Sequence, residues 1–301
     1  MTAPRIGLVL GGGGARGVAH VAVLDALEDL GLRPVAVAGS SMGSIIGAAY
    51  AAGLSAAEIR ERLIAAFGTR GNVFSRLWRL RPRSLGAVFG QDGVGFGRLD
   101  AERVIGVFVD DAFPATFADL RTPFVAVATD FYGGTEVHLS QGKLLQAVAA
   151  SCALPGIFRP VVIDGRVMVD GSILNPVPVD ALPQPVDIAI AVDVVSFPEP
   201  HEGQAGPTAV GSVLGSAQLM MQQLMMPKLE RFPPDILIRP PIGGFHVMDF
   251  LKTREILDAC DTIREDVKRR LARLIEHPEL PAIDRERQSL QVVGQGPSTL
   301  R

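Results

Sequence analysis

The chain has 301 residues, of which 48% are hydrophobic and 20% are charged. This balance supports a large buried core and excludes a disordered, collagen-like or coiled-coil protein. The formal charge of -3 offers no general attraction to nucleic acid, so we expect no nucleic-acid partner. The two cysteines, Cys152 and Cys260, are too few for a disulfide framework, which favours a reducing, cytoplasmic location.

Two uncharged stretches reach the length of a membrane span, residues 34–57 and 205–227. Both are rich in Ala, Gly, Ser or Gln rather than in Leu, Ile and Phe, which predicts buried or interfacial segments. The N-terminus runs directly into an apolar stretch and a glycine cluster, without the pattern of a signal peptide. We therefore expect a cytoplasmic protein, and peripheral contact with a membrane stays an open alternative.

The N-terminal part of the chain predicts strands and helices in alternation. They follow in the order strand 6–10, glycine turn 11–14, helix 15–30, strand 35–38, tight turn 39–43 and helix 44–52. This order is typical of a parallel sheet, because successive parallel strands need a crossover helix between them.

Further apolar runs predict strands at residues 124–129, 161–163, 167–169, 188–194 and 236–238, with helices near 144–153 and 253–275. The fold class is therefore α/β, a three-layer α/β/α sandwich with a central, mainly parallel sheet over residues 1–280. Residues 70–99 mix aromatic side chains with arginines and predict an insertion or flap. Residues 281–301 predict a polar, flexible tail.

The glycine-rich turn matches a dinucleotide-binding pattern through Gly12, Gly14 and Gly17. A nicotinamide site also needs an acid at the end of the second strand, and that strand ends in Gly-Ser-Ser-Met-Gly instead. No Lys-Ser or Lys-Thr follows Gly17, which excludes a P-loop. The pattern still predicts backbone N–H groups that bind an anion of another kind at the start of a helix.

The second turn matches a nucleophile elbow, with Ser41 between Gly39 and Gly43. Such a turn needs small neighbours, because a strained serine must project its hydroxyl away from the sheet. Together with the glycine-rich loop, it predicts half of an acyl-transfer site, a nucleophile beside an oxyanion hole.

The serine also needs a base, and the histidines do not supply one that the sequence singles out. They are His20, His138, His201, His246 and His277, which share no motif with the elbow. Asp170 ends an apolar run and is followed by glycine, so its carboxylate is expected to be partly desolvated. Desolvation raises the basicity of a carboxylate, which makes Asp170 the candidate base.

These motifs resemble the patatin-like phospholipase family, particularly bacterial members related to the neuropathy target esterase catalytic domain. The resemblance rests on Gly-Gly-Gly-Gly-Ala-Arg-Gly at 11–17, Gly-Ser-Ser-Met-Gly at 39–43 and Asp-Gly-Ser at 170–172. The block at 150–160, ending in Pro-Gly-Ile-Phe-Arg-Pro, is similar to the one that precedes the family's aspartate. Ser172 replaces the commoner Gly or Ala, a change small enough to leave Asp170 in place.

The resemblance implies a Ser–Asp dyad without histidine, with Ser41 as nucleophile and Asp170 as base. It also implies an oxyanion hole formed by Gly12, Gly13 and Gly14, and loop-supporting or substrate-binding positions at Arg16, Gly17, Gly39, Gly43 and Gly171. For Arg16, bracing the loop and meeting a substrate phosphate are both open.

The implied activity is hydrolysis of a phospholipid, a lysophospholipid or another acyl ester, with no metal and no organic cofactor. A non-catalytic lipid-binding or regulatory module on the same fold is the alternative, and a nicotinamide-dependent dehydrogenase is the third hypothesis. The oligomeric state is not predicted.

Four further features have two interpretations each. Asp130 and Asp193 end apolar strands, where turn or cap formation is favoured over ligand binding. Cys152 is expected to be a small core residue rather than a nucleophile. The methionine-rich stretch 219–226 is either a wall for an acyl chain or ordinary helix packing, and the segment around Trp78 either contacts a membrane surface or forms a solvated flap.

Overall fold

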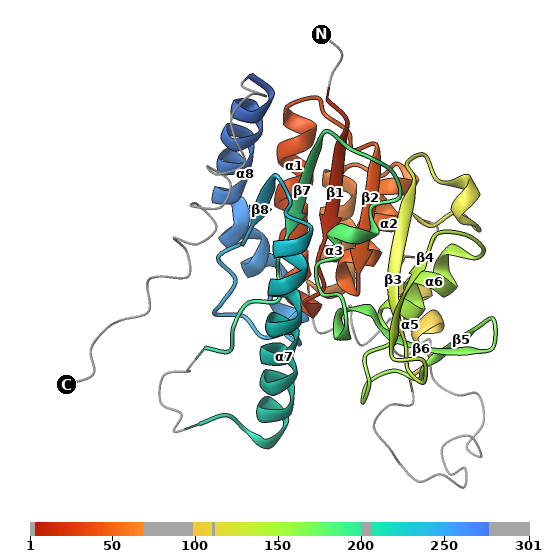
Figure 1. Cartoon of the computed structure of the whole chain (residues 1–301). Helices are drawn as coiled ribbons and strands as arrows, with labels where there is room; N and C mark the ends of the chain where they lie inside the picture. Colours follow the sequence, from red (N-terminus) through yellow and green to blue (C-terminus); the bar gives the residue numbers. More distant parts are fainter. Residues whose placement is uncertain (1–3, 69–98, 110–111, 200–205, 277–301) are drawn as a thin grey trace, which may run out of the picture.

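The computed structural model describes residues 4–68, 99–109, 112–199 and 206–276 (Figure 1). The predicted flap at 70–99, with the exception of Leu99, and the predicted tail at 281–301 lie outside these residues.

The centre of the described structure is one sheet of eight strands. The strands are β1 (Ile6–Leu10), β2 (Ala36–Ser40), β3 (Phe124–Asp130), β4 (Thr135–Leu139), β5 (Val161–Ile163), β6 (Arg166–Asp170), β7 (Ile188–Val192) and β8 (Ile236–Ile238). Their order is β5-β6-β3-β2-β1-β7-β8, and β4 also pairs with β3. The five strands from β3 to β8 are parallel, while β4, β5 and β6 are antiparallel additions at one side. The predicted mainly parallel sheet is confirmed.

The parallel strands are buried on both faces, which explains their unbroken apolar sequences. Every residue of β1, β2, β3 and β7 is buried. Along β1, Leu8 and Leu10 enter the larger core, while Val9 enters a second core on the opposite face. Because neighbouring side chains of a strand point to opposite faces, one apolar run supplies both cores.

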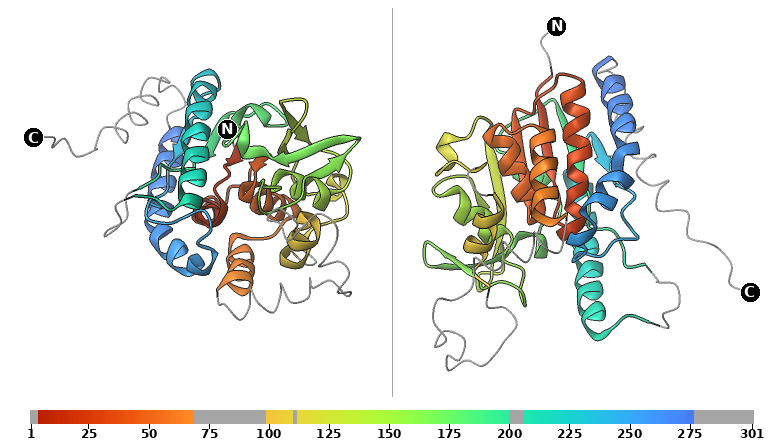
Figure 2. Two further views of the ribbon diagram at one scale, coloured as in Figure 1. Left: turned by 90° about the horizontal axis from the view of Figure 1, so that it is seen from below. Right: turned by 180° about the vertical axis from the view of Figure 1, so that it is seen from behind.

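Helices cover both faces of the sheet, and the predicted three-layer sandwich is therefore confirmed. The helices are α1 (His20–Asp29), α2 (Met42–Ala52), α3 (Ala56–Phe67), α5 (Ala101–Val109), α6 (Leu144–Ser151), α7 (Ala209–Arg231) and α8 (Thr253–Glu276). Figure 2 shows α7 on one side of the sheet and α1, α2 and α8 on the other. Met225 and Leu229 of α7 pack against Val9 and Ala191.

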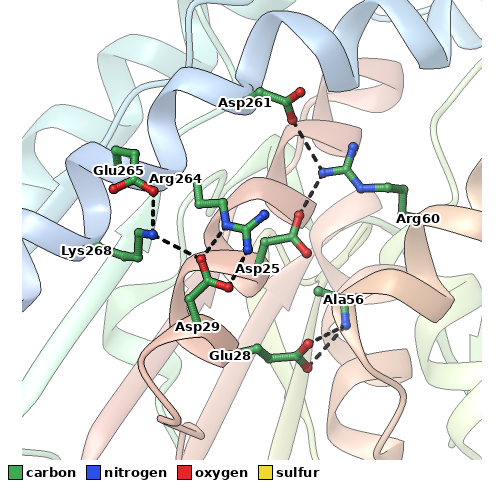
Figure 3. A network of polar contacts seen from close by, with 9 residues as sticks. All are labelled: Asp25, Glu28, Asp29, Ala56, Arg60, Asp261, Arg264, Glu265 and Lys268. Carbon is green, nitrogen blue, oxygen red and sulfur yellow. Dashed lines mark hydrogen bonds and ion pairs between the residues drawn. The ribbon is translucent and has the colours of Figure 1, made fainter.

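Charged side chains tie α8 and α3 to α1 (Figure 3). The Asp29 carboxylate binds Arg264, and Lys268 Nζ lies 3.1 Å from Asp29 Oδ2. Arg60 of α3 reaches Asp25 of α1 at 2.7 Å. The network connects the outer helices to α1, although partly exposed ion pairs each contribute only about 0–1 kcal/mol.

The first helix differs from its prediction at its start. The sequence predicts one helix over residues 15–30, whereas the chain forms a 3-10 helix at Gly14–Ala19 and only then α1. Gly14 has a left-handed φ of 58°, and the Ala15 amide donates to the Val247 carbonyl at 2.8 Å. Both features replace the regular first turn of an α-helix.

Within residues 4–68, 99–109, 112–199 and 206–276, no helix combines the length and the apolar character that crossing a membrane requires. The uncharged stretch 34–57 contributes β2 and α2, both of them packed in the core. The stretch 205–227 forms most of α7.

Candidate active site

Ser41 lies in the sharp turn between β2 and α2. Its φ of 51° and ψ of −124° are strained values for a residue with a side chain. A Cβ at Gly43 would lie 2.0 Å from the Leu10 carbonyl oxygen, and one at Gly39 would lie 2.5 Å from the Gly43 carbonyl oxygen. The turn is so tight that both flanking positions require glycine.

Hydrogen bonds on both sides hold the backbone of Ser41. Its amide donates to Ser151 Oγ at 3.0 Å, and the Ser151 hydroxyl in turn donates to the Val127 carbonyl at 2.6 Å. Its carbonyl accepts from Ser44 Oγ at 2.7 Å and from Cys152 Sγ at 3.1 Å. These contacts stabilise the strained conformation. The sequence does not predict the role of Ser151, because its partners Ser41 and Val127 belong to other elements. Ser44 bonds the N-cap residue of its own helix.

Asp170 meets Ser41 from the end of β6. Ser41 Oγ donates to Asp170 Oδ2 at 2.7 Å. The other carboxylate oxygen accepts from the Ser172 amide at 2.8 Å. Asp170 is 2% exposed, and antiparallel pairing of β6 with β3 sets it opposite Ala128. At the next residue, Gly171, the backbone passes so close to β3 that a Cβ would lie 2.0 Å from the Val127 carbonyl oxygen.

Burial raises the pKa of Asp170 above its ordinary value of 3.8, while hydrogen bonds from Ser41 and Ser172 oppose this rise. A desolvated carboxylate is a stronger base than one in water. Ser41 therefore donates its hydrogen bond to a group that can accept the serine proton.

The amides of the glycine-rich loop fall into two groups. The Gly11 and Gly12 amides donate to the carbonyls of Val192 and Pro176 at 3.0 and 2.9 Å. The Gly13 and Gly14 amides donate to no acceptor in the part of the chain that the structure describes. Of the three predicted oxyanion donors, Gly12 is therefore engaged within the protein, and Gly13 and Gly14 are the ones that can face a ligand.

Gly12 and Gly17 support the loop through close packing. A Cβ at Gly12 would lie 1.8 Å from Ser172 Oγ and 3.0 Å from Ser41 Cβ. A Cβ at Gly17 would lie 2.4 Å from Met42 Cγ. The loop can approach the dyad this closely because these positions lack side chains.

His20 lies behind the loop rather than in the site. Its Nε2 is 2.8 Å from the Gly11 carbonyl oxygen, and the ring is fully buried. Burial lowers the pKa of His20 to about 4, so the ring is neutral at pH 7 and can donate from Nε2. The sequence does not single out His20 as a base and does not by itself predict this contact. The available signal was a histidine surrounded by buried apolar positions of the first helix.

Arg16 is buried between the loop and the cavity. It is 2% exposed, and its Nε lies 3.5 Å from the Gly13 carbonyl oxygen. One terminal nitrogen, Nη2, is buried without a hydrogen-bond partner among the described residues. Burial lowers the pKa of Arg16 to about 10, and the charge of Asp193 opposes this shift. The long Nε contact fits loop bracing, and the unpartnered Nη2 fits a ligand contact.

A mainly apolar cavity of about 430 Å³ opens beside the dyad. Ser41, Asp170, Gly13, Gly14 and Arg16 contribute to one part of its wall. Most of the remaining wall is aliphatic or aromatic and comes from α2, α3, α5 and α7: Ile45, Ile46, Ala49, Ile59, Leu63, Ala66, Phe67, Val104, Ile105, Phe108, Leu214, Ala217 and Met221. The polar groups of the dyad, the loop and Arg16 therefore lie next to a mainly apolar surface.

The remaining sequence candidates make structural contacts in the described fold. Cys152 is buried and burial raises the pKa of its thiol, so it is a core residue as expected. Asp193 accepts from the Val195 amide at 3.0 Å and pairs with Arg239 at 3.1 Å. Asp130 accepts from the amides of the following turn and pairs with Arg166 at 2.7 Å. Turn formation was the favoured interpretation for both aspartates, and these contacts fit it.

One group of side chains has the composition of a metal site. In the described ranges, only Glu136, His138 and Asp180 bring three metal-binding atoms within 4.8 Å of one another. Lys228 Nζ lies 2.5 Å from Glu136 and 3.1 Å from Asp180. The single ammonium group of Lys228 contacts both carboxylates, so ion pairing accounts for this cluster.

The family model described as patatin-like phospholipase matches residues 8–183, more than half of the chain. The chain belongs to the patatin-like phospholipase family. Its matched region contains the glycine-rich loop, the elbow at Ser41 and the turn at Asp170. The resemblance found in the sequence is thereby confirmed.

Several family members are similar over most of this chain. An NTE family protein of Mycobacterium tuberculosis is 36% identical over 207 residues, which cover 68% of this chain and 52% of that protein. Human patatin-like phospholipase domain-containing protein 6 is 31% identical over 289 residues, covering 86% of this chain and 20% of that protein. Lysophospholipase nte1 of Aspergillus fumigatus is 26% identical, covering 83% of this chain and 17% of that protein. The chain thus spans about half the length of its mycobacterial relatives and less of the others.

Among solved structures, VipD from Legionella pneumophila is similar with a TM-score of 0.47 and 16% identity, covering 88% of this chain and 67% of that chain. Human GIVD cytosolic phospholipase A2 gives a TM-score of 0.40 with 11% identity, covering 91% of this chain and 63% of that chain.

Proposed function

We propose that this protein is a serine acyl hydrolase that cleaves the ester bond of a phospholipid, a lysophospholipid or a similar lipid acyl ester. The observation that carries the proposal is the 2.7 Å hydrogen bond from Ser41 Oγ to the buried Asp170, at the wall of an apolar cavity. Family membership and the relative named lysophospholipase nte1 support the substrate class.

In the first half of the reaction, Asp170 Oδ2 accepts the hydroxyl proton as Ser41 Oγ attacks the ester carbonyl carbon. The carbonyl oxygen becomes an oxyanion, for which the amides of Gly13 and Gly14 are the free donors of the loop. When the tetrahedral intermediate collapses, the bond to the alcohol breaks and the alcohol leaves with the proton from Asp170. An acyl-enzyme on Ser41 remains.

In the second half, Asp170 accepts a proton from water, and the hydroxide attacks the acyl carbon. The proton returns to Ser41 Oγ as the acyl bond breaks and the fatty acid leaves. Each proton that Asp170 takes is given back within the cycle, so the dyad needs neither a metal nor an organic cofactor to complete it.

The apolar wall of the cavity fits the acyl chain of such a substrate. An acyl chain gains about 0.8 kcal/mol for each methylene group that it buries. Among the described residues that line the cavity, the charged side chains are Asp170 of the dyad, Arg16 beside it, and Arg62 of α3. This division between a polar centre and an apolar wall is expected for an ester of a long fatty acid.

The experiment is to incubate the purified protein with lysophosphatidylcholine and to identify released fatty acid by mass spectrometry. We expect release by the wild type, and at least about a hundredfold slower release by Ser41→Ala and by Asp170→Asn. Ser216→Ala and Asp258→Asn alter exposed residues outside the cavity and serve as matched controls with full activity. Full activity of either dyad variant would contradict the proposal, and inactivity of the wild type on every acyl ester would favour the non-catalytic alternative.

A further inference from the structure

The helix α7 has an uncharged outer face. From Ala209 to Pro227 it contains no Asp, Glu, Lys, Arg or His, although 20% of the whole chain is charged. Four large apolar side chains on this stretch are exposed: Val213 by 71%, Leu219 by 47%, Met220 by 61% and Leu224 by 46%. A helix that only meets water carries charged side chains on that face, so this one is suited to an apolar partner.

The inner face of the same helix belongs to the cavity. Leu214, Ala217 and Met221 line it together with Ser41. The Gln218 and Gln222 side chains donate to the Ser196 carbonyl at 2.8 and 3.1 Å. These bonds fix α7 to the segment that follows β7, so its outer face keeps a fixed position relative to the cavity.

Other exposed apolar side chains lie at the same end of the molecule. Met248 and Leu251, which are 48% and 45% exposed, follow the end of β8, and Met248 also lines the cavity. In Figure 1, the lower part of α7 extends past the carboxyl ends of β1 and β7. We name the exposed side chains of Val213, Leu219, Met220, Leu224, Met248 and Leu251 the outer apolar surface.

We propose that the outer apolar surface docks on the surface of a lipid aggregate, so that the cavity faces the lipid from which its substrate comes. The inference rests on the proposed function, because a pocket for acyl esters is what places lipid at this end of the sheet. Cavity and surface share α7, and Met248 belongs to both. Because α7 carries no charge on this surface, burial of apolar side chains drives binding to the lipid, rather than attraction to anionic headgroups.

An uncharged docking surface predicts how binding depends on lipid charge and on salt. Binding through the outer apolar surface is expected to occur on zwitterionic vesicles and to persist at high salt. Binding through arginines, such as those of residues 70–99, would instead need anionic lipid and would weaken as salt screens the charges.

The test measures co-sedimentation of the full chain with phosphatidylcholine vesicles in 0.5 M NaCl. It is performed in the Ser41→Ala background so that turnover does not alter the vesicles. We expect the unaltered surface to bind and Val213→Asp/Met220→Asp to lower the partition coefficient by at least tenfold. Neither residue lines the cavity. In the background with native Ser41, turnover of a short water-soluble ester is therefore expected to be unchanged.

A matched control variant and a second surface variant distinguish loss of docking from misfolding. Leu30→Asp/Ile275→Asp introduces the same two charges at residues 36% and 37% exposed, at the ends of α1 and α8 remote from the cavity. This variant is expected to bind as the parent does. Val213→Ser/Met220→Gln removes the apolar groups without adding charge and is expected to weaken binding as well.

Three results would overturn the proposal. The first is salt-independent vesicle binding that is equal in the parent and in Val213→Asp/Met220→Asp, and the second is complete loss of binding by the parent in 0.5 M NaCl. Alternatively, sedimentation velocity without lipid would show a dimer that this variant dissolves, which would assign the surface to a second copy of the chain. Failure of the proposed function is distinguishable, because full ester turnover by Ser41→Ala would refute the dyad and leave vesicle binding untouched.

Discussion

The hydroxyl of Ser41 lies 2.7 Å from Asp170 Oδ2, although 129 positions separate the two residues in the chain. Ser41 follows β2 and Asp170 ends β6, and both strands are neighbours of β3. The contact therefore depends on the position of β3 between them. A carboxylate buried in this way is costly for the fold.

Asp170→Asn is expected to reduce ester turnover by about 10²–10⁴-fold, because an amide cannot accept the serine proton. The same change is expected to raise the free energy of unfolding at pH 7. Burial raises the pKa of Asp170 in the folded protein. The contribution of this group to the free energy of unfolding is therefore fully present below pH 3.8, the pKa in the unfolded chain, and is lost as the pH rises through the higher folded pKa. Chemical denaturation at pH 7 measures this, and a destabilised Asp170→Asn would show that the carboxylate stabilises the fold.

His20 is expected to limit stability in acid. The unfolded ring binds a proton with a pKa of 6.5 and the folded ring with a pKa of about 4, so the unfolded chain binds more protons between these values. The contribution of His20 to the free energy of unfolding is therefore fully present above pH 6.5. It decreases as the pH falls toward 4, by about 3 kcal/mol in total. Denaturation at a series of pH values measures the slope of the free energy of unfolding against pH.

His20→Gln provides the control for that slope. Its amide can donate to the Gly11 carbonyl but does not titrate, so the contribution between pH 6.5 and 4 should vanish in this variant. His20→Ala loses the hydrogen bond as well, and we expect it to lower kcat for a soluble ester with little change in KM. Identical pH profiles for wild type and His20→Gln would contradict the assignment.

Gly43→Ala is expected to lower the free energy of unfolding by more than about 2 kcal/mol and to remove activity. Its Cβ would lie 2.0 Å from the Leu10 carbonyl oxygen, which belongs to the central strand and cannot move away. Gly244→Ala is the matched control, because its Cβ would meet no atom within 4 Å. Thermal unfolding of the two variants checks the prediction, and equal stability would show that the elbow tolerates a side chain.

Ala66→Leu is expected to shift the preference toward shorter acyl chains. Ala66 is buried and lines the apolar part of the cavity, so a larger side chain occupies volume that an acyl chain would use. We expect kcat/KM for a palmitoyl ester to fall about tenfold and that for a butyryl ester to stay unchanged. Ala57→Leu alters an exposed position of the same helix and should leave both values unchanged. An equal loss on both esters would contradict a role in chain length.

The central strands and the two turns could be predicted because their signals are local. Continuous apolar runs give β1, β2, β3 and β7, which are buried on both faces. The turns at Gly11–Gly14 and Gly39–Gly43 are marked by glycines, since no other residue fits their close approaches. Burial of Asp170 could also be inferred, from the apolar strand that it ends.

Other features depend on contacts between distant parts of the chain. The Gly12 amide is engaged by the Pro176 carbonyl, and no local pattern distinguishes it from Gly13. The strand β4 has a mostly exposed or half-buried sequence and exists because it pairs with β3. The helix α3, by contrast, begins with a capping box of Ser55 and Glu58 that the sequence already contains.

The most direct test of the central claim is labelling with a fluorophosphonate, which reacts with an activated serine. Mass spectrometry of the intact protein followed by peptide mapping is expected to give one adduct, on Ser41, with Asp170→Asn labelling at least a hundredfold more slowly. Ser216→Ala should label as the wild type does. The account would be contradicted by an adduct on another serine, by no adduct at all, or by equal labelling rates of wild type and Asp170→Asn.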